Sequence, residues 1–222
     1  MALLYASCAQ AQETPPHVVG DLGLGVSVAP VAVPAQSRRG SAVPYANFDY
    51  AQFFARIDTF GVKLAPAGYG SLELLTRVLE DGYSGGTMPL AHRNSSLPLG
   101  LGTLQVTPVG ALMVNLYRDL GKSRGTMLDL MYAAEIELDR FALYPQAGVE
   151  YRSDNYVRYY DGVPRSATNP YAALLIETHL SGRWYAIANL RRTWLDDAIR
   201  SNPLVRRRTL DAGLLALSYR FD

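Results

Sequence analysis

Apolar and polar residues alternate along many short segments of this chain, and the alternation is clearest in segment 209–221. Every second residue of one set there is apolar, aromatic or glycine: Gly213, Leu215, Leu217, Tyr219 and Phe221. A period of two places this set on one face of a β-strand and the intervening residues on the other. One face suits lipid and the other a hydrated interior, as in the strands of membrane-spanning β-barrels. A strand of a soluble protein shows the same alternation, so this segment alone leaves both classes open.

The alternation recurs in segments 21–28, 72–79, 128–139 and 174–180. A soluble sandwich must bury every apolar face in a core, whereas a membrane barrel turns them all toward lipid and its charged faces inward. We therefore expect an all-β fold, a transmembrane antiparallel up-and-down β-barrel. The predicted interior faces carry charges of both signs, which suits a small barrel filled by ion pairs. The acidic residues are Asp129, Glu135 and Glu137, and the basic ones are Arg77, Arg183 and Arg191.

The composition agrees with this class. The chain has 222 residues, enough for one domain, and its charged fraction of 18% lies below the roughly 25% of a typical soluble domain. Its 15 tyrosines suit the two aromatic girdles of a barrel. No apolar run reaches the ~18 residues that a transmembrane helix needs. The net charge of +1 gives no electrostatic argument for nucleic acid as a partner.

The first residues resemble the remnant of an export signal. A short apolar stretch, 2–7, precedes the small-x-small site Ala9-Gln10-Ala11, so we expect residues 1–11 to be signal peptide and 12–222 to be the barrel. The basic start of such a signal is missing, which places the true start upstream; a disordered tail is the alternative. The single cysteine, Cys8, falls in this segment and rules out an internal disulfide or a cysteine metal site. A lipoprotein signal ending at Cys8 is a weak alternative, because Tyr5 is a poor first residue for it.

The pattern predicts about ten strands, with twelve as the alternative. They are expected near 18–30, 43–57, 60–66, 71–81, 102–119, 125–138, 140–152, 171–180, 183–195 and 208–221. With both termini in the periplasm, tight turns fall on that side and longer loops outside. The final strand ends in Tyr219 and Phe221, which resembles the assembly signal of outer-membrane barrels, although Asp222 follows. The expected location is the outer membrane of a Gram-negative bacterium.

The predicted outward loops are rich in basic residues. Arginine matches phosphate in a bidentate fashion, so this basic rim is predicted to bind the phosphates of lipopolysaccharide. The alternative is that these loops are simply polar. The rim residues are Arg38, Arg39, Lys122, Arg124, Arg158, Arg165, Arg200, Arg206 and Arg207.

One connection, Gly82 to Leu101, is long where a short periplasmic turn is expected. Loops of this length in compact domains are usually functional or contain an element that has been missed. The segment would plug the interior, dock a periplasmic partner, or add a hairpin that brings the barrel to twelve strands. The candidate docking residues are Gly85, Met88, Pro89, Leu90, His92 and Asn94.

Several short motifs resemble the MipA/OmpV family of outer-membrane proteins. They are 143–151 (LYPQAGVEY), 159–163 (YYDGV), 201–205 (SNPLV), 22–26 (LGLGV) and 99–101 (LGL), ahead of the strand that ends Tyr219-Arg220-Phe221. Asp161, Asn202 and Asp222 depart from the pattern. The resemblance covers nearly the whole mature chain, and none of its motifs is catalytic.

The resemblance implies a scaffold rather than an enzyme. The protein that gives the family its name is associated with a murein-hydrolysing lytic transglycosylase and a bifunctional penicillin-binding protein, so the expected partners are periplasmic murein enzymes, the membrane and its lipopolysaccharide. Other members are described as porin-like, which makes a small channel for solutes or antibiotics the alternative function. No cofactor is expected.

Catalytic chemistry finds little support in the residues. None of His17, His92 and His179 is spaced from another as metal ligands are, so no metal site is expected. His179 and Ser181 would share a strand face with Glu177, as in outer-membrane lipid A deacylases. However, Ser181 falls at a predicted periplasmic turn and the remaining motif is absent, so a lipid A hydrolase is an outside alternative.

Overall fold

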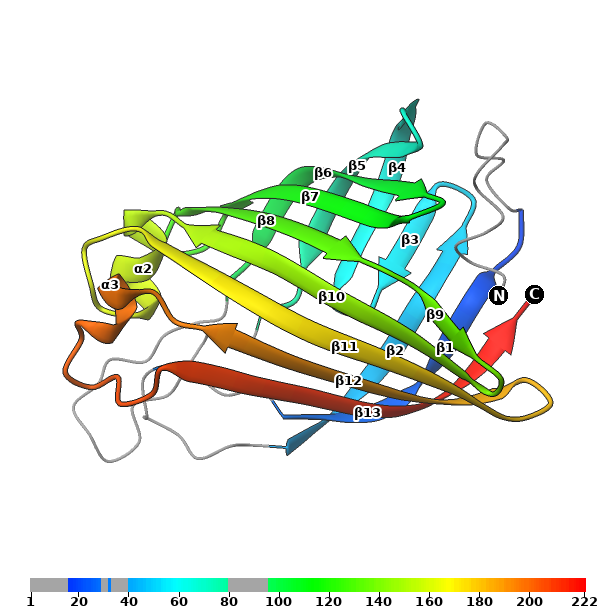
Figure 1. The fold of residues 1–222 in the computed structure, drawn as a ribbon. Coiled ribbons are helices and arrows are strands. Elements are labelled where there is room, and N and C mark those ends of the chain that lie inside the picture. The colour runs from blue at the N-terminus through cyan, green and yellow to red at the C-terminus, as the bar shows by residue number, and fades with distance from the viewer. Residues whose placement is uncertain (1–15, 29–31, 33–39, 80–95) are drawn as a thin grey trace.

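The computed structural model describes residues 16–28, 32, 40–79 and 96–222. Within them thirteen strands and two short helices follow one another along the chain (Figure 1). The elements are β1 (Val19–Val28), β2 (Gly40–Tyr50), β3 (Phe53–Arg56), β4 (Thr59–Ala67), β5 (Gly70–Arg77), β6 (Pro98–Thr107), β7 (Gly110–Asp119), β8 (Thr126–Ala133), β9 (Ile136–Leu138), β10 (Phe141–Arg152), α2 (Asp154–Tyr160), β11 (Ala167–Ser181), β12 (Trp184–Trp194), α3 (Asp197–Arg200) and β13 (Thr209–Phe221).

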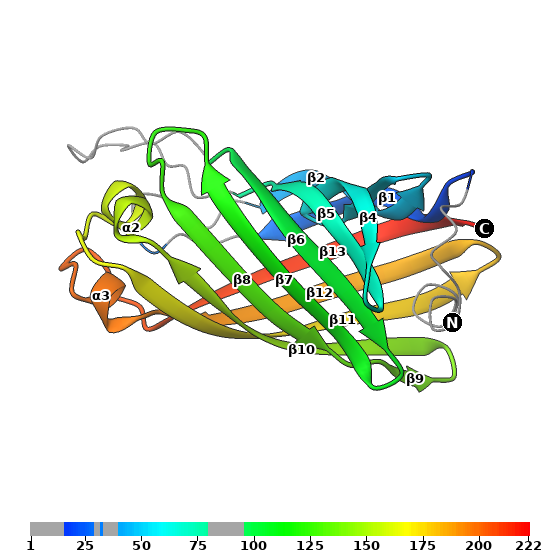
Figure 2. The same ribbon diagram turned by 90° about the horizontal axis from the view of Figure 1, so that it is seen from above.

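The strands form one closed antiparallel barrel. Apart from β8 and β9, which both pair with β10, each strand pairs with its neighbour in the chain, and β1 closes the ring by pairing with β13. Short β9 continues the line of β8 along β10, so twelve strands complete the ring. Neighbouring strands lie side by side and tilt together across the long axis (Figure 2). The predicted fold class is confirmed, and the barrel has twelve strands, the number given as the alternative to ten.

The two additional strands come from turns that the pattern did not predict. Predicted strand 43–57 contains a turn at Ala51-Gln52, which separates β2 from β3, and 102–119 contains a turn at Pro108-Val109. Ala51 has a φ of 49°, a value that favours glycine or asparagine, so this turn lacks the usual residue signature. The strands do not come from a hairpin within 82–101, as the alternative assumed.

The missed turn at 51–52 also reverses the expected side of the connection between β5 and β6. Strand β5 runs away from the chain termini, so Arg77 and Pro98 lie at the opposite end of the barrel. The expectation that segment 82–101 joins the strands on the side of the termini is therefore wrong. Residues 80–95, which include the candidate docking residues, lie outside the described part of the chain.

Side chains sort by the alternation that the sequence predicts. On β1, Leu22, Leu24 and Val26 point outward, and the exposed fraction of Leu24 is 75%. Asp21 on the same strand is completely buried. The outer face is thus apolar and the interior is polar, which is the reverse of a soluble globular domain.

The break between β8 and β9 has a cause in the opposite strand. Pro145 of β10 faces this break, where its carbonyl accepts a hydrogen bond from the Ala134 nitrogen at 3.0 Å. Proline has no N–H to return, so the ladder is interrupted at this point. Pairing resumes with Leu143 opposite Ile136.

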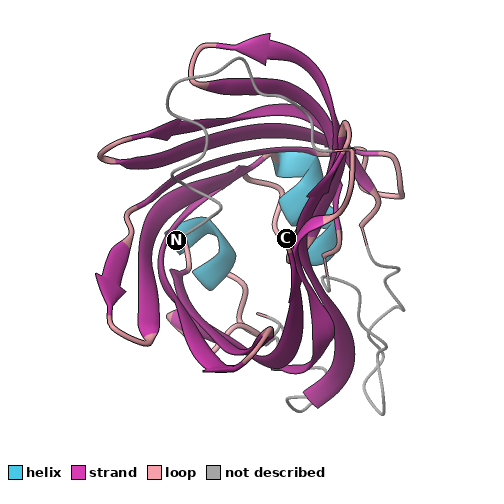
Figure 3. Cartoon of the chain, turned by 90° about the vertical axis from the view of Figure 1, so that its right-hand side faces the viewer, coloured by secondary structure: helices cyan, strands magenta, loops and turns pink. Residues whose placement is uncertain are grey.

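Two folded connections cover the barrel end opposite the C-terminus (Figures 1 and 3). Helix α2 lies between β10 and β11, and α3 between β12 and β13, where the sequence predicts only loops. The Asp196 side chain caps the N-terminus of α3 by accepting from the Ala198 nitrogen.

Two apolar clusters hold the two connections with α2 and α3, together the helical cap, in place. One comprises Val157, Val163, Ala167, Leu195, Ile199 and Val205; the other comprises Phe54, Leu75, Tyr117, Met127, Tyr156 and Tyr160. Neither described helix is long and apolar enough to cross a membrane.

Candidate functional site

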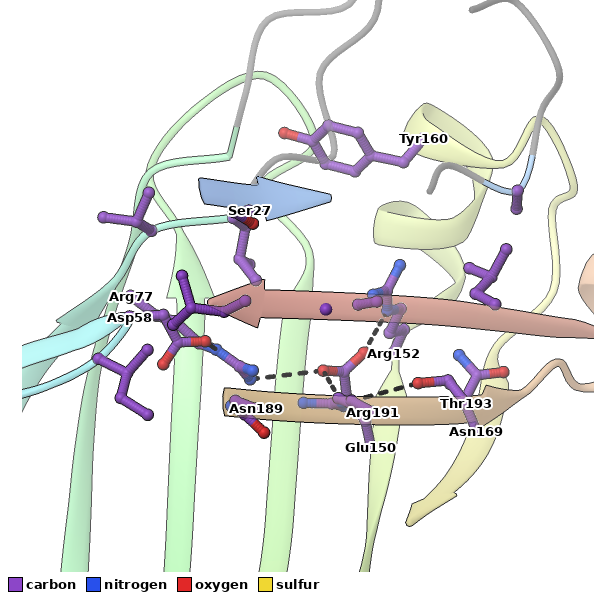
Figure 4. Close-up of a pocket in the computed structure, with 18 of the residues that line it drawn as sticks. Ser27, Asp58, Arg77, Glu150, Arg152, Tyr160, Asn169, Asn189, Arg191 and Thr193 are labelled. Atoms are coloured by element: carbon purple, nitrogen blue, oxygen red, sulfur yellow. Dashed lines mark hydrogen bonds and ion pairs between the residues drawn. The ribbon is translucent and has the colours of Figure 1, made fainter. Parts of the chain in front are cut away.

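The interior is organised around Glu150, a carboxylate of β10 that is only 3% exposed. Its Oε1 accepts from Arg152 Nε at 2.6 Å, and its Oε2 lies 3.5 Å from Arg77 and 3.8 Å from Arg191. Burying one carboxylate is unfavourable unless partners compensate its charge. Three arginines from three strands provide that compensation (Figure 4).

Arg77 extends the network across the barrel. Its guanidinium contacts Asp58 at 2.8 Å and Asp129 at 3.0 Å. The Tyr171 hydroxyl donates to Asp129 at 2.9 Å, and the Arg191 guanidinium lies 3.7 Å above the Tyr171 ring. A continuous chain of charged groups thus runs through the interior from the β3–β4 turn to β12.

The sequence predicts which charged residues face the interior but not how they pair. Arg77 meets Asp129, whereas Arg191 meets Glu150 and Arg183 meets Asp222 near the C-terminus at 3.6 Å. Two predicted acids take other positions. Glu135 accepts from the Tyr144 hydroxyl at 3.1 Å, and Glu137 lies exposed in the middle of β9.

Two further buried carboxylates each bind an arginine in the part of the interior nearer the barrel end that carries the C-terminus. Arg220 makes a bidentate contact with Asp21 at 2.9 and 2.8 Å and also reaches Glu177 at 2.8 Å. Arg56 makes a bidentate contact with Glu73 at 2.8 and 2.7 Å. Bidentate pairs fix both partners in space as well as neutralising them, so the interior is filled by side chains at several levels.

A cavity of about 410 Å³ lies between this network and the helical cap (Figure 4). Its polar lining includes Arg77, Glu150, Arg152, Asn169, Asn189 and Arg191. Its apolar lining includes Val43, Phe60, Leu79, Leu195, Ile199 and Leu214. Within the described structure, Asn189 Oδ1 is buried without a hydrogen-bond partner. The sequence gives no signal for this cavity, because its residues come from most strands of the ring.

The residues of the predicted basic rim that the structure describes share one end of the barrel. They lie exposed in three connections: Lys122 and Arg124; Arg158 and Arg165; and Arg200, Arg206 and Arg207. Two have acidic neighbours, Asp154 for Arg158 at 3.3 Å and Asp197 for Arg200 at 2.6 Å. Arg38 and Arg39 lie outside the described residues.

The aromatic residues of the last strand stack on the outer face. The rings of Tyr219 and Phe221 lie 5.2 Å apart, and Trp184 meets Tyr219 edge-on at 5.3 Å. Trp194 occupies the other end of β12, and both tryptophans are more than 40% exposed. These positions agree with interfacial girdles.

The catalytic alternative does not assemble. The His179 ring bonds the Gly182 carbonyl at 2.9 Å rather than Ser181, and the β11–β12 register shifts between residues 179 and 181. Glu177, the third candidate, is paired with Arg220. No cluster of three or more His, Cys, Asp or Glu side chains suited to a metal occurs among the residues with described positions.

A closed barrel with an apolar outer face and an ion-paired interior is the organisation of β-barrels that cross a membrane. The profile of the family described as MltA-interacting protein MipA matches residues 22–221, and the chain belongs to this family. The MltA-interacting proteins of Escherichia coli (strain K12) and Shigella flexneri are each 25% identical to it over 147 residues. These matches cover 60% of this chain and 59% of each relative, so the chain spans about 59% of their length. The predicted family resemblance is confirmed.

Proposed function

We propose that this barrel resides in the outer membrane of a Gram-negative bacterium and acts as a scaffold for a murein-remodelling enzyme. Membership of the MipA family is the observation that carries the proposal, because the relatives are named for interaction with MltA. The partner class is a lytic transglycosylase, with a penicillin-binding protein as a second member of the assembly. The charged chain from Asp58 to Arg191 supports a binding role over a channel, since it crosses the interior.

The docking surface is best assigned to the barrel end that carries the C-terminus. In the proposed orientation this end faces the periplasm, where murein enzymes act. Its short turns are 51–52, 68–69, 108–109, 139–140 and 182–183. Tyr69 and Val109 stand out there, with exposed fractions of 65% and 77%. Exposed apolar side chains on turns are candidates for contact with a protein partner.

The same orientation places the basic rim outside the cell. Its exposed arginines and lysine suit the phosphates of lipopolysaccharide, and this binding is part of the proposal. The apolar clusters beneath the helical cap include residues of two of these connections, 153–166 and 195–208, which keeps their rim charges together.

A crosslinked pull-down from native envelopes tests the scaffold. The intact chain is expected to recover a lytic transglycosylase, and Tyr69→Ser combined with Val109→Ser is expected to lose most of it. Leu204→Ser, an apolar-to-polar change at the opposite end, serves as the matched control. A variant shortened between Gly85 and Leu90 tests the predicted docking loop separately, and loss in that variant alone would move the docking surface there.

Failure of the folded barrel to recover any murein enzyme would overturn the scaffold. Bilayer conductance then decides whether the chain is a small channel. We expect conductance close to that of protein-free bilayers, because the ion-paired side chains occupy the interior.

A further inference from the structure

The wall of the barrel is incomplete beside residues 40–45 of β2, the half of the strand nearer the helical cap. Strand β3 pairs with β2 only over Asn47–Tyr50, and Ile57 adds one bond by donating to the Ala46 carbonyl at 2.7 Å. Residues 40–45 pair with β1 on their other edge. In the described part of the chain, no strand covers their free edge.

Pro44 lies in this free edge. The bond between Ile57 and Ala46 shows that the even-numbered residues of β2 direct their backbone groups toward β3. Pro44 belongs to this set and has no N–H to leave unpaired. Pro44 therefore removes one unpaired N–H from an edge where, in an apolar environment, each such group would be unfavourable, while Ala42 of the same set keeps its N–H.

The cavity beneath the helical cap reaches this opening. Its lining includes both Val43 and Pro44, neighbours whose side chains point to opposite faces of the strand. Ile57, Phe60 and Val78 line it from the other side of the opening. Because Val78 is 61% exposed, the cavity extends to the outer face of the barrel.

The outer face around the opening is apolar. Leu24 and Val26 lie opposite Pro44 and Ala42 in the β1–β2 register and are 75% and 55% exposed. On the other flank, Val78 follows the outward-facing Leu74 and Thr76 of β5. In a membrane-spanning barrel this position contacts lipid, so the opening would admit molecules dissolved in the membrane.

The lining specifies the polarity of the occupant. The charged side chains among its described lining residues are Arg77, Arg152 and Arg191 against Asp58, Glu150 and Asp161, three positive and three negative, so these six charges sum to zero. A charged ligand would have to compete with pairs already formed around Glu150. Asn189 lines the cavity, and its Oδ1 is buried without a hydrogen-bond partner in the described structure. A neutral donor of a ligand that reaches this oxygen would supply the missing hydrogen bond.

We propose that this cavity binds a neutral amphipathic molecule, with an apolar body and one hydrogen-bond donor, that enters from the membrane between β2 and the β3–β4 turn. The volume of about 410 Å³ falls within the range of small-molecule sites, which are largely apolar with a few polar groups. This site is independent of the scaffold role, which uses the opposite end of the barrel.

Binding of N-phenyl-1-naphthylamine to the intact protein in lipid nanodiscs tests the site. This probe is neutral, apolar and carries one N–H, and nanodiscs without the protein give the fluorescence of probe dissolved in lipid, which is subtracted. Ala212→Trp fills the cavity from β13, and affinity is expected to fall at least tenfold. Leu215→Trp, on the lipid face of the same strand, is the matched control and is expected to bind like the unchanged protein. Equal affinity in both variants would overturn the site.

Asn189→Leu tests the donor preference without adding bulk. We expect affinity for the probe to fall about fivefold, as for a lost hydrogen bond, and affinity for 1-phenylnaphthalene to stay unchanged. An equal fall for both compounds would contradict the assigned role of Asn189. This variant also covers the case in which Ala212→Trp fails to fold.

The route of entry has its own test. Ala212→Cys, in a chain with Cys8→Ser, is exposed either to membrane-dissolved N-pyrenylmaleimide or to a charged, water-soluble methanethiosulfonate. Each labelling rate of the cysteine is divided by the rate at which the same reagent reacts with a free thiol, so that the two reagents can be compared. Lateral entry predicts a relative rate at least tenfold higher for the membrane-dissolved reagent, and slower labelling by it when Val78→Trp narrows the opening. A higher relative rate for the water-soluble reagent would overturn the lateral route.

Discussion

Neutralising Glu150 is the sharpest test of the interior network. Glu150→Gln keeps the shape of the side chain and removes the negative charge that Arg77, Arg152 and Arg191 share. Arg77 keeps Asp58 and Asp129 as partners. Arg191 keeps a hydrogen bond to Thr193 and its contact with the Tyr171 ring, but among the described residues it loses its carboxylate partner.

The expected magnitude follows from burial and distance. A pair of unit charges about 4 Å apart attracts by about 4 kcal/mol at an effective dielectric constant of 20. The Arg191–Glu150 separation is 3.8 Å, and the carboxylate side chain is 4% exposed. Removing one partner of a buried pair costs about 3–5 kcal/mol. All three arginines keep other contacts, including that of Arg152 with the Tyr156 ring at 5.3 Å. We therefore expect a loss of about 3 kcal/mol, at the lower end of this range.

Urea unfolding of the barrel in lipid vesicles, followed by fluorescence of Trp184 and Trp194, measures this loss. Asp211→Asn is the matched control, because it breaks the exposed Arg192–Asp211 pair at 2.6 Å and should leave the midpoint unchanged. Adding Arg191→Gln to Glu150→Gln should restore part of the stability, since it removes the charge left unpaired. The reasoning is refuted if Glu150→Gln and Asp211→Asn unfold at the same urea concentration.

Three further predictions concern the seam, the last strand and the rim. Gly23→Ala would place a Cβ too close to the Leu217 carbonyl oxygen across the β1–β13 seam, and should destabilise the barrel by about 1–3 kcal/mol in the same urea assay. A change below about 0.5 kcal/mol would contradict this close approach. Phe221→Ala should lower the amount of folded barrel in cells, measured by heat-dependent migration in gels, if the aromatic end is the assembly signal; unchanged amounts would exclude that role. Lys122→Gln with Arg124→Gln should weaken lipopolysaccharide binding several-fold at low salt and less at high salt, measured by calorimetry; a salt-independent loss would argue against a phosphate contact.

The fold class was predictable because each strand of the barrel carries its own signal. Alternation in segments such as 21–28 depends only on which face of the strand points out of the barrel, so it can be identified without knowing the neighbouring strands. Strand number was harder, since Ala51-Gln52 turns the chain without glycine, proline or asparagine. Pro108, by contrast, was a turn signal within a segment that was read as one long strand.

The charged character of the interior could be predicted from the sequence, but the pairing of its side chains could not. Inward-facing acids and arginines are visible from the alternation, and Arg77 does meet Asp129. Which arginine reaches Glu150 depends on the tilt and register of strands distant in the chain, which the alternation does not encode. The cavity depends on the same unknowns, and on helices α2 and α3, which are too short to show a helical period.

The seam between β1 and β13 has a consequence for how the protein is made. Asp21 and Arg220, which meet across it, are separated by 199 positions in the chain. The ring cannot close until β13 has been synthesised, so a partly synthesised chain leaves an edge of β1 without its partner. Forming so distant a contact is slow. In the proposed outer-membrane location, the polypeptide would therefore have to be kept from aggregating on its way through the periplasm, and we expect a chain that stops before Thr209 to be degraded instead of inserted.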